Sequence, residues 1–200
     1  MNEQNKQMKT TNQKTNPGRF GRSVSAALFI SKGTLCALAV LLGGGLTALA
    51  AGADNRAPEV PDEIVVPGTT NKVHFHGFGV GVQIYTWNGV SWGSAVPEAT
   101  LFHDNGVVAT HFAGPSWESN SGSLVVGAVV TPVIVDTNAI PWVLLRAVQT
   151  SGPGIFADIT YIQRVNTTGG KAPLTDGTFV GQVARMPYTA DYFFYRATND

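Results

Sequence analysis

The sequence predicts an all-β domain, either an antiparallel β-sandwich or a β-barrel with short hairpins, behind an N-terminal signal segment. Three observations on the 200-residue chain lead to this class. Apolar residues recur with a period of two from Asn71 onward. Turn sequences separate these stretches every ~8–14 residues, and no long helical pattern lies between them. The 23 glycines and 11 prolines suit a chain that is rich in turns.

Residues 1–50 have the layout of a secretory signal peptide. A polar, basic stretch precedes an apolar run from Thr34 to Ala51, and Ala48-Leu49-Ala50 matches an A-x-A cleavage pattern. The alternative is an uncleaved membrane anchor, but the run is short for a bilayer span and Gly43-Gly44-Gly45 weakens a helix. Cys36, the only cysteine, lies in this run, so we expect the mature domain to have no disulfide. We expect export to the extracellular space or the periplasm, and no membrane span after cleavage.

The charges are distributed unevenly along the chain. Residues 1–50 carry six Lys and Arg against one Glu, whereas residues 51–200 carry seven Lys and Arg against twelve Asp and Glu. An acidic body repels nucleic acid and anionic membrane surfaces. We therefore expect no nucleic-acid partner.

The exported part divides into a leader and one domain. Residues 51–70 are predicted to form a Pro-rich, extended leader that packs poorly, apart from Ile64-Val65-Val66. Residues 71–200 are predicted to form a single all-β domain. The residues from Val80 to Ile84 alternate, so that Gln83 and Tyr85 face away from the three aliphatic side chains. The strand candidates, in order, are 72–77, 80–87, 99–103, 107–113, 123–131, 142–149, 155–165 and 188–196.

Three turn sequences predict hairpins. Asn88-Gly89 is a strong two-residue hairpin signal, with Val90-Ser91-Trp92 returning from it. Asp104-Asn105-Gly106 and Ser151-Gly152-Pro153-Gly154 predict the second and third.

One glycine-rich segment has the composition of a phosphate-binding loop but not its context. Gly77-Phe78-Gly79-Val80-Gly81 is followed by a strand pattern, whereas the dinucleotide fingerprint needs a helix at that point. The glycines instead indicate a strand whose backbone is closely approached by its neighbours.

The histidines suggest a metal site. His74 and His76 are two residues apart, so on a strand they share a face, and His111 or His103 could add a third ligand for zinc or copper. The register of the second hairpin matters here. If Asp104-Asn105-Gly106 is a three-residue loop, His103 and His111 share a face; if the loop is Asn105-Gly106 alone, they lie on opposite faces. No other cofactor is expected.

Two further sets of side chains bear on chemistry. His111 and Glu118 are the best acid/base candidates for a hydrolase, and they could meet if the intervening Gly-Pro turn folds back. Arg146 and Arg164 lie inside otherwise apolar strands, and each needs a partner if it is buried. Asp158 or Glu98 could serve as these partners.

Aromatic residues provide the candidates for ligand contact. An exposed tryptophan can stack on a sugar ring or another flat ligand, although most aromatics in small β domains fill the core. Trp92 and Trp117 are the best exposed candidates, since Gly93-Ser94 and Pro115-Ser116 lie beside them.

Five stretches together resemble a known family, the secreted bacterial and fungal proteins catalogued as domain of unknown function 3455. The resemblance covers about residues 60–197. It implies no catalytic residues, because the family is uncharacterised. It implies cysteines in many members at the position of Trp87 and near Asp176-Gly177, and this chain has neither. The segment from His111 to Glu118 is the best match that contains reactive side chains. The stretches are GVQIYTW, PEATLFHDNGVVATHFAGPSWES, AIPWVLLRAV, GIFADITYIQRVNTTGGKAP and PYTADYFFYRA.

Three functions fit these observations. The first is a non-enzymatic exported β domain that binds an envelope or extracellular ligand, such as a glycan, through Trp92 or Trp117. The second is a zinc, copper or redox protein that uses His74, His76 and His111. The third is a hydrolase in which Glu118 and His111 form the acid/base pair.

Overall fold

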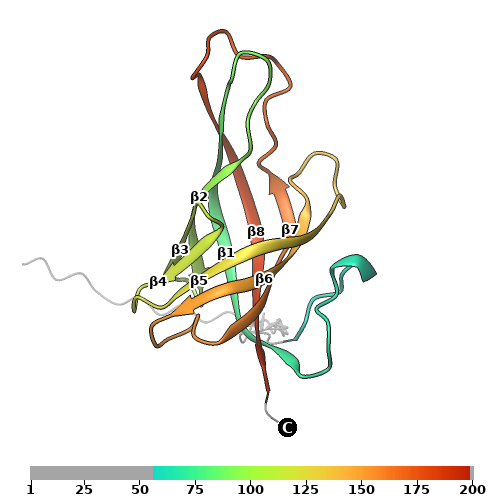
Figure 1. Cartoon of the computed structure of the whole chain (residues 1–200), viewed down its shortest axis with the longest axis vertical. Coiled ribbons are helices and arrows are strands. Elements are labelled where there is room, and N and C mark those ends of the chain that lie inside the picture. Colours follow the sequence, from blue (N-terminus) through green and yellow to red (C-terminus); the bar gives the residue numbers. More distant parts are fainter. Residues whose placement is uncertain (1–55, 199–200) are drawn as a thin grey trace, which may run out of the picture. The chain divides into compact units, whose positions relative to one another are not determined.

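The computed structural model describes residues 56–198, and these form one antiparallel sheet of eight strands that closes into a barrel (Figure 1). The predicted all-β class is confirmed, and of the two architectures left open the chain adopts the barrel. The predicted signal peptide, residues 1–50, lies outside the described residues. A short 3-10 helix, η1 (Asp62–Ile64), precedes the strands: β1 (Asn71–Thr86), β2 (Val96–His103), β3 (Gly106–Phe112), β4 (Ser116–Ser119), β5 (Leu124–Val133), β6 (Trp142–Ser151), β7 (Ile159–Gly169) and β8 (Val183–Ala197).

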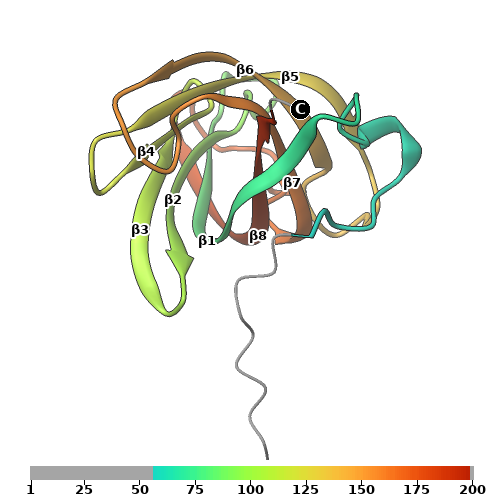
Figure 2. The ribbon, with the colours of Figure 1, turned by 90° about the horizontal axis from the view of Figure 1, so that it is seen from below.

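The barrel is a simple meander that the first and last strands close. Each strand pairs with the next one along the chain, and β8 returns to pair with β1 (Figure 2). This closing seam runs from the pair Asn71–Ala197 to the pair Thr86–Val183, with one irregularity between Val73 and Phe75. Closure removes the free sheet edges that an open sheet would expose.

Strand alternation decides which side chains enter the barrel. In β1, Gln83 and Tyr85 point inward and are 2% and 7% exposed, whereas Val80 on the other face is 43% exposed. The two faces predicted for this strand are therefore confirmed. The largest fully buried side chains of the interior are Trp117, Tyr192, Phe156, Phe194, Leu101 and Ile162.

The glycines of β1 make room for this packing. A Cβ atom on Gly79 would lie 2.6 Å from Cε2 of Tyr192, and one on Gly81 would lie 2.2 Å from the carbonyl oxygen of Glu98. Real Cβ atoms do not approach so closely, so a larger residue would have to displace the buried Tyr192 ring at Gly79 and the backbone of β2 at Gly81. The interpretation of this segment as a closely approached strand is confirmed.

A second, smaller core covers part of the outside of the barrel. Ile64 of η1 is fully buried and packs with Leu144, Val165 and Phe193, which face outward from β6, β7 and β8. The Gln163 side-chain amide donates a hydrogen bond of 2.7 Å to the carbonyl of Ile64. The leader is thus fixed to the wall at the stretch where its sequence predicted packing.

Two predicted turns differ from the structure in detail. Asp104 and Asn105 form the second hairpin loop by themselves, with positive φ angles of 47° and 64°, and His103 pairs with Gly106. Positive φ at both positions is the requirement of a type I′ turn, which Asp and Asn tolerate well. Neither predicted register is therefore correct. At the first hairpin, Trp87 and Trp92 form an isolated bridge and regular pairing resumes only at Val96.

Residues 56–198 contain no helix that is long and apolar enough to cross a membrane.

Candidate functional site

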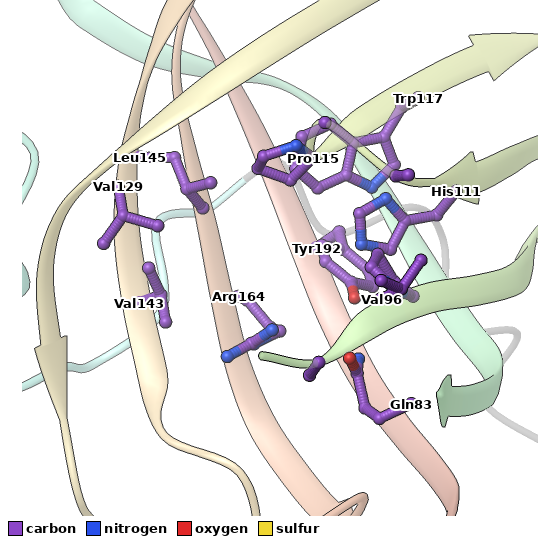
Figure 3. Close-up of a pocket in the computed structure, with 14 residues that line it drawn as sticks. Gln83, Val96, His111, Pro115, Trp117, Val129, Val143, Leu145, Arg164 and Tyr192 are labelled. Carbon is purple, nitrogen blue, oxygen red and sulfur yellow. The ribbon is translucent and has the colours of Figure 1, made fainter. Parts of the chain in front are cut away.

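A cavity of about 250 Å³ lies inside the barrel, and side chains from all eight strands reach it (Figure 3). Since water takes up about 30 Å³ per molecule in the liquid, the cavity has room for roughly eight water-sized groups. Most of its wall is apolar, and its exposed rim includes residues 95–96 and 113–114. The lining residues are Gln83, Ala95, Val96, Pro97, His111, Ala113, Gly114, Pro115, Trp117, Val129, Val143, Leu145, Arg164 and Tyr192.

His111 is held rigidly in the wall and is neutral at pH 7. The residue is 2% exposed, and its ring stacks on Trp117 with centroids 4.3 Å apart and planes 2° from parallel. Nδ1 lies 2.8 Å from the carbonyl oxygen of Ser116. Because a carbonyl only accepts, Nδ1 carries the proton and Nε2 is the acceptor. Desolvation by burial lowers the pKa of His111 to about 3, against the weaker opposing effect of the Ser116 hydrogen bond.

Two buried donors at the cavity have no hydrogen-bond partner among the described residues. These are Nε1 of Trp117 and Nε2 of Gln83, on side chains that are 1% and 2% exposed. Leaving a buried donor unsatisfied costs about 1–3 kcal/mol, so native proteins rarely do it without a reason. A ligand with acceptor atoms would remove this cost.

Among the described residues that line the cavity, Arg164 is the only one with a charged side chain. Its Nε and Nη2 atoms both donate to the carbonyl oxygen of Pro141, at 3.3 and 2.9 Å. The side chain is half-buried, and no carboxylate of residues 56–198 forms a salt bridge with it. Glu98, one of the two predicted partners, pairs instead with Arg185. Neither of the two suggested partners, Glu98 and Asp158, therefore forms an ion pair with Arg164.

Two tyrosines add hydroxyl groups that stay protonated. The hydroxyl oxygens of Tyr188 and Tyr192 lie 3.0 Å apart in the barrel interior. Burial raises the pKa of both, that of Tyr192 well above its usual value, while the nearby Arg164 charge acts in the opposite direction. Both remain neutral donors and acceptors at physiological pH.

The hydrolase pair is not formed. His111 pairs with Trp117 across β3 and β4, and Glu118 pairs with Thr110 one position further along. Adjacent positions on a strand face opposite sides of the sheet, so His111 points inward while Glu118 is exposed on the outer surface. The intervening turn does fold back, as this hypothesis required, but it leaves the two groups on opposite faces of the sheet, so they cannot act as a pair.

The predicted metal ligands do not converge. His74 is exposed next to the irregularity in β1, and His76 faces outward, where it stacks on Phe193 and lies 2.8 Å from Asp191. His111 points into the barrel. Among residues 56–198, no three His, Cys, Asp or Glu side chains are arranged to hold a metal ion. His103 is also held elsewhere, with Nδ1 2.8 Å from the carbonyl oxygen of His76.

The two tryptophans that we expected on the surface differ in exposure. Trp117 is fully buried, because its pairing with His111 places it on the inward face of β4. It is therefore a wall of the cavity and not an open platform. Trp92 is partly exposed, but it packs edge-on against Trp87, and its Nε1 donates to the Thr175 carbonyl at 3.0 Å.

Residues 67–196 match a family described as "Protein of unknown function (DUF3455)". The chain belongs to this family. The match covers nearly all of the barrel from the start of β1 to the end of β8. No curated protein and no solved structure matches the chain. Membership of the DUF3455 family thus confirms the resemblance that the sequence indicated, and it assigns no activity.

The structure also brings together the two positions at which DUF3455 relatives are expected to carry cysteines. A Cβ atom on Gly177 would lie 2.7 Å from Cβ of Trp87. The indole of Trp87 therefore packs directly on the Gly177 backbone. In this chain a tryptophan–glycine contact joins these two positions.

Sequence reasoning missed Gln83, Arg164 and Tyr192 as cavity residues. The available signal was a polar side chain inside an otherwise apolar strand, which both Gln83 and Arg164 provide. A buried polar side chain needs a hydrogen-bond or charge partner, and a polar residue in an apolar strand therefore marks a place where a ligand can supply one.

Proposed function

We propose that the chain is exported and that its barrel binds a small organic ligand in the interior cavity without altering it chemically. The observation that carries this proposal is a pair of buried donors, Gln83 Nε2 and Trp117 Nε1, which have no partner in the described part of the chain and lie at a cavity with a largely apolar wall. Ligand sites typically combine an apolar lining with a few converging polar groups. An eight-stranded barrel is wide enough to hold one small ligand.

The size and position of Trp117 determine the kind of ligand. A buried indole with a cavity of about 250 Å³ beside it suits a compact molecule, not an extended oligosaccharide. Trp92 is a poorer anchor, because its indole N–H is already engaged within the protein. We therefore place the extracellular or envelope ligand in the cavity, against Trp117.

Binding is favoured over catalysis because of the state of His111. Its low pKa keeps the ring neutral, its Nδ1 is committed to Ser116, and Glu118 lies on the other face of the sheet. A general acid/base needs a pKa near the working pH and a partner within hydrogen-bond reach.

A neutral fluorescent probe, 1-aminoanthracene, tests for ligand binding. Val129 lines the cavity at its rim, whereas the neighbouring Val130 does not; they are 58% and 52% exposed. We expect one probe to bind per wild-type chain, Val129→Trp to abolish binding by filling the cavity, and Val130→Trp to leave it unchanged. Absence of binding to the wild type, or equal binding to both variants, would overturn the proposal.

Export has its own test. The full chain is expressed in a bacterial host, and the culture medium, periplasm and cytoplasm are separated. We expect the protein outside the cytoplasm with a new N-terminus close to Ala51. An intact N-terminus in the cytoplasmic fraction would refute this part of the proposal.

A further inference from the structure

We propose that the ligand is a small organic carboxylate, held by its carboxylate group at Arg164 with its apolar body against Val143 and Leu145. This inference rests on the proposed function, since it specifies the chemical class of the molecule that occupies the cavity. It is argued from the charge, the hydrogen-bonding character and the shape of the wall (Figure 3).

The charge of the wall is positive and unbalanced. Arg164 is the only charged residue among those that line the cavity, because His111 is neutral. The two hydrogen bonds to Pro141 satisfy part of the guanidinium but bring no negative charge. Arginine stays protonated in proteins, and removing its charge from water without a counter-ion is unfavourable. A carboxylate supplies that counter-ion and fits the planar guanidinium with two parallel hydrogen bonds.

The hydrogen-bonding character of the wall points the same way. Gln83 Nε2 and Trp117 Nε1 are both donors, and both are buried without an acceptor among residues 56–198. Together with Arg164 they form a set that a ligand satisfies with acceptor atoms. An ionised carboxylate is acceptor-only, with about four lone-pair sites. No Asp or Glu lines the cavity, so an ammonium group on the ligand would find no counter-ion there.

The remaining wall requires an apolar body. Val143, the cross-strand neighbour of Arg164, and Leu145 are 5% and 4% exposed, and Pro115 and Val129 complete this apolar surface. A small inorganic anion would satisfy Arg164 but leave this surface uncovered. The volume of about 250 Å³ limits the body to roughly the size of two or three fused aromatic rings or a medium-length alkyl chain.

Two isosteric probes, benzoate and benzamide, separate the carboxylate from the ring. Binding of each to the wild-type exported protein is measured directly by titration calorimetry. Since hydrogen bonds to charged groups contribute about 1.5–3 kcal/mol, we expect benzoate to bind about tenfold or more tightly than benzamide. Arg164→Gln should remove this preference. Arg146→Gln, which changes an exposed arginine of the same sheet, should keep it.

The neutral probe 1-aminoanthracene distinguishes failure of this inference from failure of the proposed function. If 1-aminoanthracene binds but benzoate binds no better than benzamide, the carboxylate assignment is wrong and the binding barrel remains. The assignment is also wrong if Arg164→Gln keeps the preference for benzoate. If neither class of probe binds, both proposals fail. Should Arg164→Gln not fold, Arg164→Lys keeps the charge but not the planar fork, and benzoate should still lose most of its advantage.

Discussion

Lowering the pH from 7 to 5 is expected to destabilise the barrel through one side chain, His111. In the folded state its pKa is about 3, whereas an ordinary histidine has a pKa of 6.5. Between these two values the unfolded chain binds a proton that the folded chain excludes. Stability that is fully present above pH 6.5 is therefore lost as the pH falls, by up to about 1.4 kcal/mol per pH unit. Integrated from pH 7 to pH 5, the loss is about 2 kcal/mol.

Urea denaturation at the two pH values, followed by tryptophan fluorescence, measures this loss. His111→Asn is the matched control, because the asparagine amide can still donate to the Ser116 carbonyl but does not titrate. The free energy of unfolding of the wild type should fall about 2 kcal/mol further than that of the variant between pH 7 and pH 5. Equal losses in the two proteins, or an NMR titration of the His111 ring with a midpoint near 6.5, would refute the reasoning.

Three other experiments test the packing. Gly81→Ala should reduce the free energy of unfolding by about 1–3 kcal/mol, because its methyl group would overlap the backbone of β2. Gly93→Ala is the control: its Cβ would lie 3.4 Å from the nearest atom, the Thr86 carbonyl oxygen, so the free energy of unfolding in the same urea assay should hardly change. Ile64→Ala should remove about 2–5 kcal/mol and speed amide hydrogen exchange in the leader; unchanged exchange would show that the leader is held by other contacts. Trp87→Cys combined with Gly177→Cys should form a disulfide on oxidation. The two Cβ positions lie 2.7 Å apart and need to separate by only about 1 Å to reach the ~3.5–4.5 Å Cβ–Cβ distance of a disulfide. Detection of two free thiols by mass spectrometry would contradict this contact.

The strands could be predicted from the sequence because the side chains on the inward face of each strand are buried in the barrel interior. Gln83 and Tyr85 alternate with the half-exposed valines of β1, and this local pattern survives in the structure. Closure could not be predicted in the same way. It depends on the pairing of β1 with β8, whose partners are 97 to 126 residues apart in the chain, and alternation says nothing about which strands become neighbours.

The site was harder to predict because β7 is covered on both sides. Ile162 faces the interior, while Gln163 and Val165 face outward beneath Ile64 of the leader. With both faces buried, the sequence of β7 does not reveal on which side Arg164 lies. For Trp117 the flanking turn suggested exposure, but its pairing with His111 places both rings in the interior.

The seam between β1 and β8 has a consequence for biosynthesis. The last of the eight strands to be synthesised is the one that completes the cylinder, and its partner is the first of them. Until residues 183–197 have been synthesised, β1 lacks one neighbour and the interior core lacks Tyr188, Tyr192 and Phe194. A growing chain without these residues cannot complete its core or close the barrel. Under the export proposed above, the barrel would close only after this last strand had also crossed the membrane.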